Sequence, residues 1–233
     1  KIDYSKKISN GELQTGYQYR YDTQNGDFLY LTKINGTDEF ETDPNFTSKV
    51  KVNNAIHAGY VQYNGSAGKL NYSAGLRLEH TDRDLVFSQN NEQTQLPFTN
   101  LFPSMQLRYA AWNKGTVKVG YSRRIKRTNN YELNPFPERE HSETLEQGDP
   151  RLLPELSGTY EAGIEQSFTG GNFFFTLYHQ RTLNPIQRVN KVFADTILNR
   201  VFTNAGRAIQ TGVETNINVQ VNKLWQSIIG GNV

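Results

Sequence analysis

The side chains that could carry out chemistry are spread thinly along the chain. Four histidines occur, and no two of them have the spacing of a metal-binding pair: His57, His80, His141 and His179. Cysteine is absent, which removes thiolate ligands and disulfides. No motif of a serine hydrolase, a zinc protease or a phosphate-binding loop occurs. The sequence therefore predicts no catalytic residue, no metal site and no cofactor, and we expect the protein not to be an enzyme.

Two groups of glutamates are the remaining candidates for a site. The first group lies in one loop and could face a cation, although a solvated loop is the simpler interpretation: Glu138, Glu140, Glu143 and Glu146. The second group, Glu161 and Glu165, shares one face of a predicted strand, in the manner of paired catalytic carboxylates. We expect this second pair to meet basic residues of a facing strand, which favours a structural role.

The balance of charged residues limits the classes of partner that the protein can be expected to bind. Lys plus Arg number 25 and Asp plus Glu number 23, so the net charge of +2 gives no electrostatic reason to expect a nucleic-acid partner. No apolar run approaches the roughly 18 residues of a membrane helix. The mean hydropathy of −0.69 is that of a water-soluble chain. A transmembrane β-barrel also gives a low value, because alternate residues face a polar lumen.

The segments that must position these residues alternate between apolar and polar side chains, which is the pattern of a β-strand. In the clearest example, residues 69–83, Leu76 and Leu78 lie on one face and Arg77 and Glu79 on the other. Ten strands are predicted, at residues 1–9, 12–22, 46–63, 69–83, 104–112, 116–126, 157–168, 173–182, 206–221 and beyond 224. Most of them reach the length of about 9–11 residues that a membrane-spanning strand needs.

The connections between these strands are alternately short and long. Short turns are predicted at residues 10–11, 64–68, 113–115, 169–172 and 222–224. Long connections lie at residues 23–45, 84–103, 127–156 and 183–205, and they hold all eight prolines. The first of them is expected to contain a small hairpin at Phe28–Thr32. An outer-membrane barrel has this arrangement, with tight periplasmic turns and long extracellular loops, whereas a soluble sandwich has no reason to keep it.

Aromatic residues border the short turns, where a barrel has its periplasmic aromatic girdle: Tyr63, Trp112, Phe168, Phe173 and Trp225. The predicted fold class is therefore all-β, an antiparallel meander of about ten long strands that forms part of a transmembrane outer-membrane β-barrel. Its apolar faces are expected to meet lipid and its polar faces the lumen. The residues expected to face the lumen are Arg77, Glu79, Arg108, Lys118, Arg124, Glu161, Glu165 and Glu214.

The most specific motifs surround the connection at residues 127–156. They are Arg123-Arg124, Leu133-Asn134-Pro135-Phe136, Gly148-Asp149-Pro150, Leu153-Pro154-Glu155 and Tyr160-Glu161. This set is similar to the C-terminal barrel of TonB-dependent outer-membrane receptors, in the subgroup common in Bacteroidetes, and the resemblance covers residues 11–233. It implies a receptor in the outer membrane of a Gram-negative bacterium that takes up a scarce nutrient with energy relayed by TonB.

The resemblance also implies which partners the protein has and how much of the barrel this chain forms. The partners are outer-membrane lipid, a small nutrient ligand of unknown identity and, through parts of the parent protein missing from this chain, a plug domain and TonB. Barrels of that family have about 22 strands. Residues 1–233 are thus expected to be a partial barrel domain without the signal, the plug and the remaining strands. Candidate ligand contacts in the extracellular loop are Arg127, Asn134, Phe136, Arg139 and Asp149.

Two alternatives remain open on the residues alone. The chain could be a complete small ten-stranded outer-membrane barrel that acts as a surface enzyme or an adhesin, or a soluble β-sandwich that binds carbohydrate. The strand arrangement supplies a sharper expectation. Because the long connection returns the chain antiparallel, Lys118 and Arg124 are expected to lie across from Glu161 and Glu165.

Overall fold

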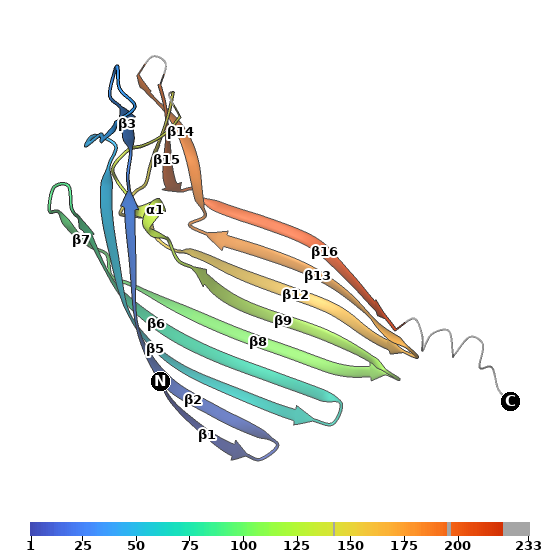
Figure 1. The fold of residues 1–233 in the computed structure, drawn as a ribbon. Coiled ribbons are helices and arrows are strands. Elements are labelled where there is room, and N and C mark those ends of the chain that lie inside the picture. Colours follow the sequence, from blue (N-terminus) through green and yellow to red (C-terminus); the bar gives the residue numbers. More distant parts are fainter. Residues whose placement is uncertain (142, 195–196, 221–233) are drawn as a thin grey trace.

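The structure is a computed structural model in which most residues belong to antiparallel β-strands. It describes residues 1–141, 143–194 and 197–220. Within these ranges no helix has the length and apolar character needed to cross a membrane. The strands form one large sheet, with two small sheets at one of its ends (Figure 1).

The large sheet is an up-and-down meander. Its path through the described residues is β1 (Ile2–Ile8), β2 (Gly11–Phe28), β5 (Ser48–Ala67), β6 (Leu70–Phe87), β8 (Phe98–Trp112), β9 (Gly115–Lys126), β12 (Glu155–Phe168), β13 (Gly171–Leu183) and β16 (Arg207–Val219). Each strand pairs antiparallel with the next, and a short strand, β7 (Gln93–Gln95), also pairs with β6. This arrangement confirms the predicted fold class.

Short hairpins join the strands at one end of the sheet and long connections join them at the other, which is the upper end in Figure 1. The long connections contain α1 (Asn130–Leu133) and the strands β3 (Leu31–Lys33), β4 (Phe40–Thr42), β10 (Glu138–His141), β11 (Thr144–Gln147), β14 (Ile186–Ala194) and β15 (Ile197–Asn204). The last four form a sheet in which β11 and β15 are parallel. We call residues 127–154 and 184–206 together the loop layer.

The strand register separates two faces of the large sheet. Leu76 lies opposite Val61 on one side and Pro103 on the other, and its side chain is 43% exposed. Exposed apolar residues share this face, which we call the apolar face: Tyr17, Tyr19, Val61, Leu76, Leu78, Met105, Val119, Tyr160, Leu177, Val213 and Ile217. The eight charged residues predicted for the lumen lie on the opposite, polar face.

The loop layer packs against the polar face at the upper ends of β5 and β6. The buried cluster there consists of Val50, Val52, Leu85 and Phe87 of the sheet with Leu133, Leu152 and Phe202 of the loop layer. Burying a side chain of this size contributes about 1.5–3 kcal/mol. The expectation that apolar strand faces meet lipid is thus wrong for the upper part of β5, because Val50 and Val52 are covered by the loop layer instead.

Two predicted segments also differ from the structure. Residues 84–103 are not one loop, since β6 continues to Phe87 and β8 already begins at Phe98. Pro103 therefore lies inside a strand. It is tolerated there because the ladder with β9 begins only at Ser104, so no amide donor is required toward β9 at that position. The small hairpin predicted at Phe28–Thr32 is instead formed by β3 and β4, and β2 extends to Phe28.

Aromatic side chains gather on the apolar face beside the short hairpins, as predicted. Trp112 and Phe168 are exposed there, and the ring centroids of Tyr63 and Tyr72 lie 5.9 Å apart. Such rings suit the boundary between membrane and water, because one end of each is apolar and the other polar. The predicted turn at 222–224, the strand after it and Trp225 lie outside the described residues.

Candidate functional site

A buried carboxylate lies on the polar face where β6 passes under the loop layer. The Glu79 side chain is 3% exposed and accepts a hydrogen bond from the Arg77 guanidinium at 2.8 Å. Its other oxygen accepts from Arg127, the first residue after β9. Alternation along β6 places Arg77 beside Glu79, and the end of β9 brings Arg127 to the same carboxylate.

Arg83 lies further along the same face of β6 and is 1% exposed. Its Nε donates to the Asn54 side chain at 3.2 Å, and its Nη1 donates to the Leu152 carbonyl of the loop layer at 3.0 Å. The guanidinium also stacks over the Phe98 ring, 5.0 Å from its centroid. Its Nη2 is buried and has no hydrogen-bond partner among the described residues. Arg83 thus ties the sheet to the loop layer.

These groups carry a net positive charge. Arg20 of β2 lies on the same face, and it acts electrostatically on Arg127. Burial lowers the pKa of the Arg127 guanidinium; the Glu79 carboxylate opposes this effect, whereas Arg20 and Arg77 reinforce it. We call Arg20, Arg77, Glu79, Arg83 and Arg127 the arginine cluster.

A second ionic group lies nearer to the short hairpins. The Glu165 carboxylate accepts from Arg108 Nη2 and from Lys118 Nζ, each at 2.9 Å. The Lys118 ammonium also lies 5.0 Å from the centroid of the Phe174 ring. Three strands, β8, β9 and β12, contribute the charged members, so the ion pairs link neighbouring strands across the polar face.

The predicted charge pairing is confirmed in one half and wrong in the other. β9 and β12 are neighbours, and Lys118 pairs with Glu165. Arg124, however, lies opposite Ser157, whereas Glu161 lies opposite Gly120. The register of the two strands separates Arg124 and Glu161 along the strand direction, so they cannot face each other.

A third ionic group holds the loop layer itself together. The Glu146 carboxylate is buried and accepts from the Tyr131 hydroxyl of α1. Arg188 Nη1 of β14 lies 3.1 Å from it, and Arg200 Nη1 of β15 lies 3.8 Å from it. One glutamate thus joins four elements of the loop layer. Of the four glutamates that could have faced a cation, Glu146 is paired with arginines instead.

Asn134 is fully buried beneath the loop layer. Its Nδ2 donates to Ser48 Oγ of β5 at 2.9 Å and to Glu138 Oε1 at 2.8 Å. Its backbone carbonyl accepts from the Gly148 amide at 2.6 Å. Burial raises the pKa of Glu138, and the hydrogen bond from Asn134 acts in the opposite direction. Asn134 therefore connects Glu138 and Gly148 of the loop layer to β5.

The other loop candidates occupy defined positions. Phe136 packs edge-on against Phe87, with ring centroids 6.0 Å apart. The Arg139 guanidinium lies 5.1 Å from the centroid of the Phe46 ring. Asp149 accepts the Arg151 amide at 2.8 Å and closes a tight turn.

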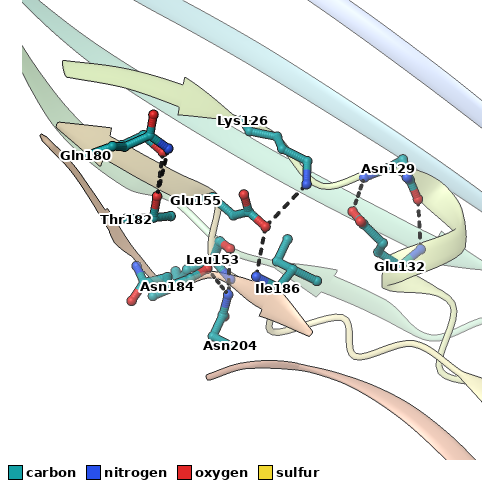
Figure 2. A network of polar contacts seen from close by, with 11 residues as sticks. Lys126, Asn129, Glu132, Leu153, Glu155, Gln180, Thr182, Asn184, Ile186 and Asn204 are labelled. Atoms are coloured by element: carbon teal, nitrogen blue, oxygen red, sulfur yellow. Dashed lines mark hydrogen bonds and ion pairs between the residues drawn. The ribbon is translucent and has the colours of Figure 1, made fainter. Parts of the chain in front are cut away.

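Polar side chains close the base of the loop layer where it meets β12 and β13 (Figure 2). Glu155 Oε1 accepts from Lys126 Nζ at 3.3 Å and from the Ile186 amide at 2.9 Å. The Asn204 side chain accepts the Leu153 amide at 2.8 Å and donates to the carbonyls of Leu153 and Asn184. These contacts fix both long connections to the ends of the same strands.

The remaining predicted residues, Arg124, Glu161 and Glu214, are exposed on the polar face. None of them forms an ion pair with another described residue. They are therefore free to contact groups beyond the described part of the chain.

Sequence reasoning missed several residues that the structure uses. Arg83 could have been found, because it shares the alternating face of Arg77 and Glu79. The roles of Glu146, Arg188 and Arg200 depend on the pairing of β11 with β15, which no local pattern indicates.

A long antiparallel meander with an exposed apolar face, a charged opposite face and structured loops at one end defines the class of transmembrane β-barrel proteins. Over residues 1–233 the chain matches the outer membrane protein beta-barrel family, and it belongs to that family. It therefore resides in the outer membrane of a Gram-negative bacterium. This result excludes the soluble β-sandwich.

Solved structures share the fold. The copper transporter OprC is 14% identical, with a TM-score of 0.66, and the match covers 93% of this chain and 34% of OprC. The ferric citrate transporter FecA is 13% identical, with a TM-score of 0.65, and the match covers 95% of this chain and 31% of FecA. The FrpB iron transporter from Neisseria meningitidis is 11% identical, with a TM-score of 0.60, and the match covers 93% of this chain and 33% of FrpB. The chain thus spans about a third of the length of these proteins. No curated protein sequence matches it.

Proposed function

We propose that this chain forms part of the barrel of a TonB-dependent receptor that takes up a scarce nutrient. The observation that carries the proposal is the loop layer. It folds from the long-connection end of the sheet onto the polar face and covers charged side chains there. A mouth lined by structured loops with a few converging polar groups suits the selection of a small ligand.

In this proposal the polar face lines a hydrated lumen. The exposed side chains of Arg124, Glu161 and Glu214 face the lumen and are available to a plug domain in the rest of the parent protein. The ion pairs of Arg108 and Lys118 with Glu165 link neighbouring strands of the barrel wall instead, because these charges already pair with one another.

The five loop candidates divide into two roles. Arg127 and Arg139 supply positive charge near the entrance, while Asn134, Phe136 and Asp149 hold the loop in the shape that presents it. The prolines of this loop reduce the entropy lost when it is ordered.

The arginine cluster favours a ligand with negative charge. Two guanidinium groups, those of Arg77 and Arg127, contact the Glu79 carboxylate, and Arg20 and Arg83 on the same face leave the cluster with an excess of positive charge. Burial strengthens the attraction of these groups for an anion. The neighbours are described as transporters of copper, ferric citrate and iron, and those ligands belong to those proteins. For this chain we propose transport of an anionic nutrient or complex, without catalysis.

The alternative of a small closed barrel receives no support from the sheet. In the described part of the chain, β1 pairs with β2 and β16 pairs with β13, and these two outer strands do not pair with each other. The sheet is therefore open, as expected for one sector of a larger barrel.

Growth under limitation tests the proposal. The gene for the full-length protein is deleted in its own bacterium, and growth is measured in media that limit chelated iron, copper, cobalamin or an oligosaccharide one at a time. We expect a defect in one medium, of the same size as the defect caused by deleting TonB, and its full reversal by the wild-type gene.

A charge variant then tests the ligand class. Arg77→Gln with Arg127→Gln is expected to raise the half-saturating nutrient concentration by about tenfold, because charged hydrogen bonds to the ligand are lost. Lys51→Gln, an exposed residue on the other face, serves as the control. Normal growth in every medium would overturn the receptor assignment. If a growth defect appears and the gene carrying both Arg77→Gln and Arg127→Gln reverses it fully, only the proposal that the ligand is anionic would be overturned.

A further inference from the structure

Carboxylates are confined to one face of four neighbouring strands, β9, β12, β13 and β16. Every described carboxylate of these strands lies on the polar face: Glu155, Glu161, Glu165 and Glu214. The apolar face of the same strands carries arginines: Arg123, Arg181 and Arg207. Positive charge on a face that meets lipid is costly unless it lies at the headgroup level with an anionic partner.

Two of these arginines flank a glycine. Arg123 lies opposite Gly158 in the ladder between β9 and β12, and Gly158 lies opposite Arg181 in the ladder between β12 and β13. The two arginine Cα atoms are thus about 10 Å apart, which is two strand spacings. Long side chains from both positions can reach one group placed over Gly158.

A hydroxyl group lies between the two arginines. A Cβ atom added at Gly158 would lie 3.0 Å from the Tyr121 hydroxyl oxygen, so the Tyr121 side chain extends over the glycine. The Tyr121 ring also contacts the Tyr160 ring, with centroids 4.6 Å apart. Two arginines therefore flank the glycine in the ladder, and a phenol hydroxyl extends over it.

The position along the strands corresponds to the upper boundary of the apolar band. Toward the short hairpins, β13 continues on this face with His179, Leu177 and Phe175, the last two of which are exposed. With the short hairpins on the periplasmic side, the two arginines lie at the level of the outer-leaflet headgroups.

Neither arginine side chain has a partner in the described part of the chain. Among the described residues no hydrogen bond, ion pair or ring contact involves the side chain of Arg123 or Arg181. On the same face of β5 and β2, by contrast, outward-facing Lys49 lies 3.7 Å from Asp27. The planar fork of arginine matches the oxygens of a phosphate group in a bidentate manner.

We propose that Arg123 and Arg181, with Tyr121 between them, form a site on the lipid-facing surface that binds a phosphate group of an outer-leaflet glycolipid. We call these residues the outer phosphate site. The occupant is a membrane lipid rather than a soluble anion, because exposed apolar side chains adjoin the site and would contact the acyl chains of the same molecule.

Lipid binding to the purified full-length protein tests the site. The protein in detergent is titrated with lipid A that carries both phosphate groups, or with the same lipid A after enzymatic removal of the phosphates, and native mass spectrometry counts the bound molecules. We expect tight binding of the phosphorylated form. Arg123→Gln or Arg181→Gln should weaken it about fivefold, and the double variant about 30-fold.

Three controls decide the outcome. Lys49→Gln should leave binding unchanged, and the lysine double variant R123K/R181K should lose less than the glutamine double variant. Inorganic phosphate at the same concentration should not displace the lipid. Equal binding of phosphorylated and dephosphorylated lipid A, unchanged binding by the glutamine double variant, or full displacement by inorganic phosphate would each overturn the proposal. Heat-modified migration in gel electrophoresis confirms that each variant is folded.

Discussion

At the scale of single residues, Glu79 shows how the polar face meets the loop layer. Removing a carboxylate from water costs several kcal/mol, and the charges of Arg77 and Arg127 offset that cost. Without Glu79, the neighbouring guanidinium groups would repel each other in a partly buried environment. The carboxylate therefore stabilises the arginine cluster more than the ion pairs on the surface of the sheet stabilise their strands.

Substitution of Glu79 measures this effect. We expect Glu79→Gln to lower the free energy of unfolding by about 2 kcal/mol, because both arginines lose their charged partner but remain partly hydrated. Glu161→Gln, on the same face but exposed and outside any ion pair, should change it by less than about 0.5 kcal/mol. Denaturant unfolding of the full-length protein in detergent compares the two variants. Equal effects would show that Glu79 is not specially placed.

Glu138 predicts a dependence on pH. Its pKa is raised in the folded loop, mainly by burial, so its charged form is disfavoured there. Its contribution to stability is therefore complete below the unfolded pKa of about 4.3 and is lost as the pH rises through the folded value. Glu138→Gln keeps an acceptor for Asn134 and removes the charge.

Hydrogen exchange tests this expectation. The amides of β10 and β11 in Glu138→Gln should exchange more slowly than in the wild type at pH 7, and the difference should disappear near pH 4. The exposed residue Glu143 provides the control, since Glu143→Gln should have no effect at either pH. A Glu138 variant that exchanges faster at pH 7 would contradict the raised pKa.

At the scale of elements, the long strands could be predicted from the sequence and the loop layer could not. Alternation over many residues identifies a strand such as β6, because each side chain must choose one of two faces. β10 and β11 have four residues each, which is too short for such a pattern. β14 and β15 pair with each other as a hairpin, and the sheet they belong to is completed by the pairing of β15 with β11 from a distant part of the sequence.

The same limit applies to the candidate site. The face of Arg124 follows from alternation, but its partner depends on the register with β12, which the connection between the strands determines. At Pro103 a local signal was misleading, because proline usually marks a loop. Pro103 instead lies in β8, at a position that pairs with β6 but not yet with β9. Local patterns therefore predicted which residues face which side, and long-range pairing decided which of them meet.

The two faces of the strands predict opposite tolerances to charge. Leu76→Arg and Val213→Arg place a charge on the apolar face, where both side chains are exposed, and each should cost about 2–4 kcal/mol near the membrane midplane. Asn71→Arg and Gln210→Arg lie on the polar face and should cost less than about 1 kcal/mol. The fraction of folded protein after refolding into lipid vesicles compares the two pairs. Equal losses would mean that the faces are assigned wrongly.

At the scale of the whole molecule, we propose that the described sheet is one sector of a larger wall. It covers about a third of the length of its structural neighbours. Both outer strands, β1 and β16, keep one edge that no described residue pairs with, and such edges favour association with further strands. We therefore expect the stability of this chain to depend on the rest of the parent protein, and the experiments above use the full-length protein.

The orientation of the sheet in the membrane supports the last prediction. The strand before residues 127–154, β9, starts at a short hairpin, and the strand after them, β12, ends at another. Both hairpins must lie on one side of the membrane and the loop layer on the other (Figure 1). Since periplasmic turns are short in this class of barrel, Asp149 should be on the cell surface and the turn at Thr169 in the periplasm.

Cysteine labelling of intact cells tests this orientation, because the chain itself contains no cysteine. An impermeant thiol reagent should label Asp149→Cys and the exposed Arg151→Cys strongly, and Thr169→Cys hardly at all until the outer membrane is permeabilised. Thr169 is preferred to Gly170, whose φ of +87° would strain a cysteine. Labelling of Thr169→Cys but not of the two loop variants in intact cells would invert the topology. The proposed nutrient entrance would then face the periplasm, which is incompatible with a receptor.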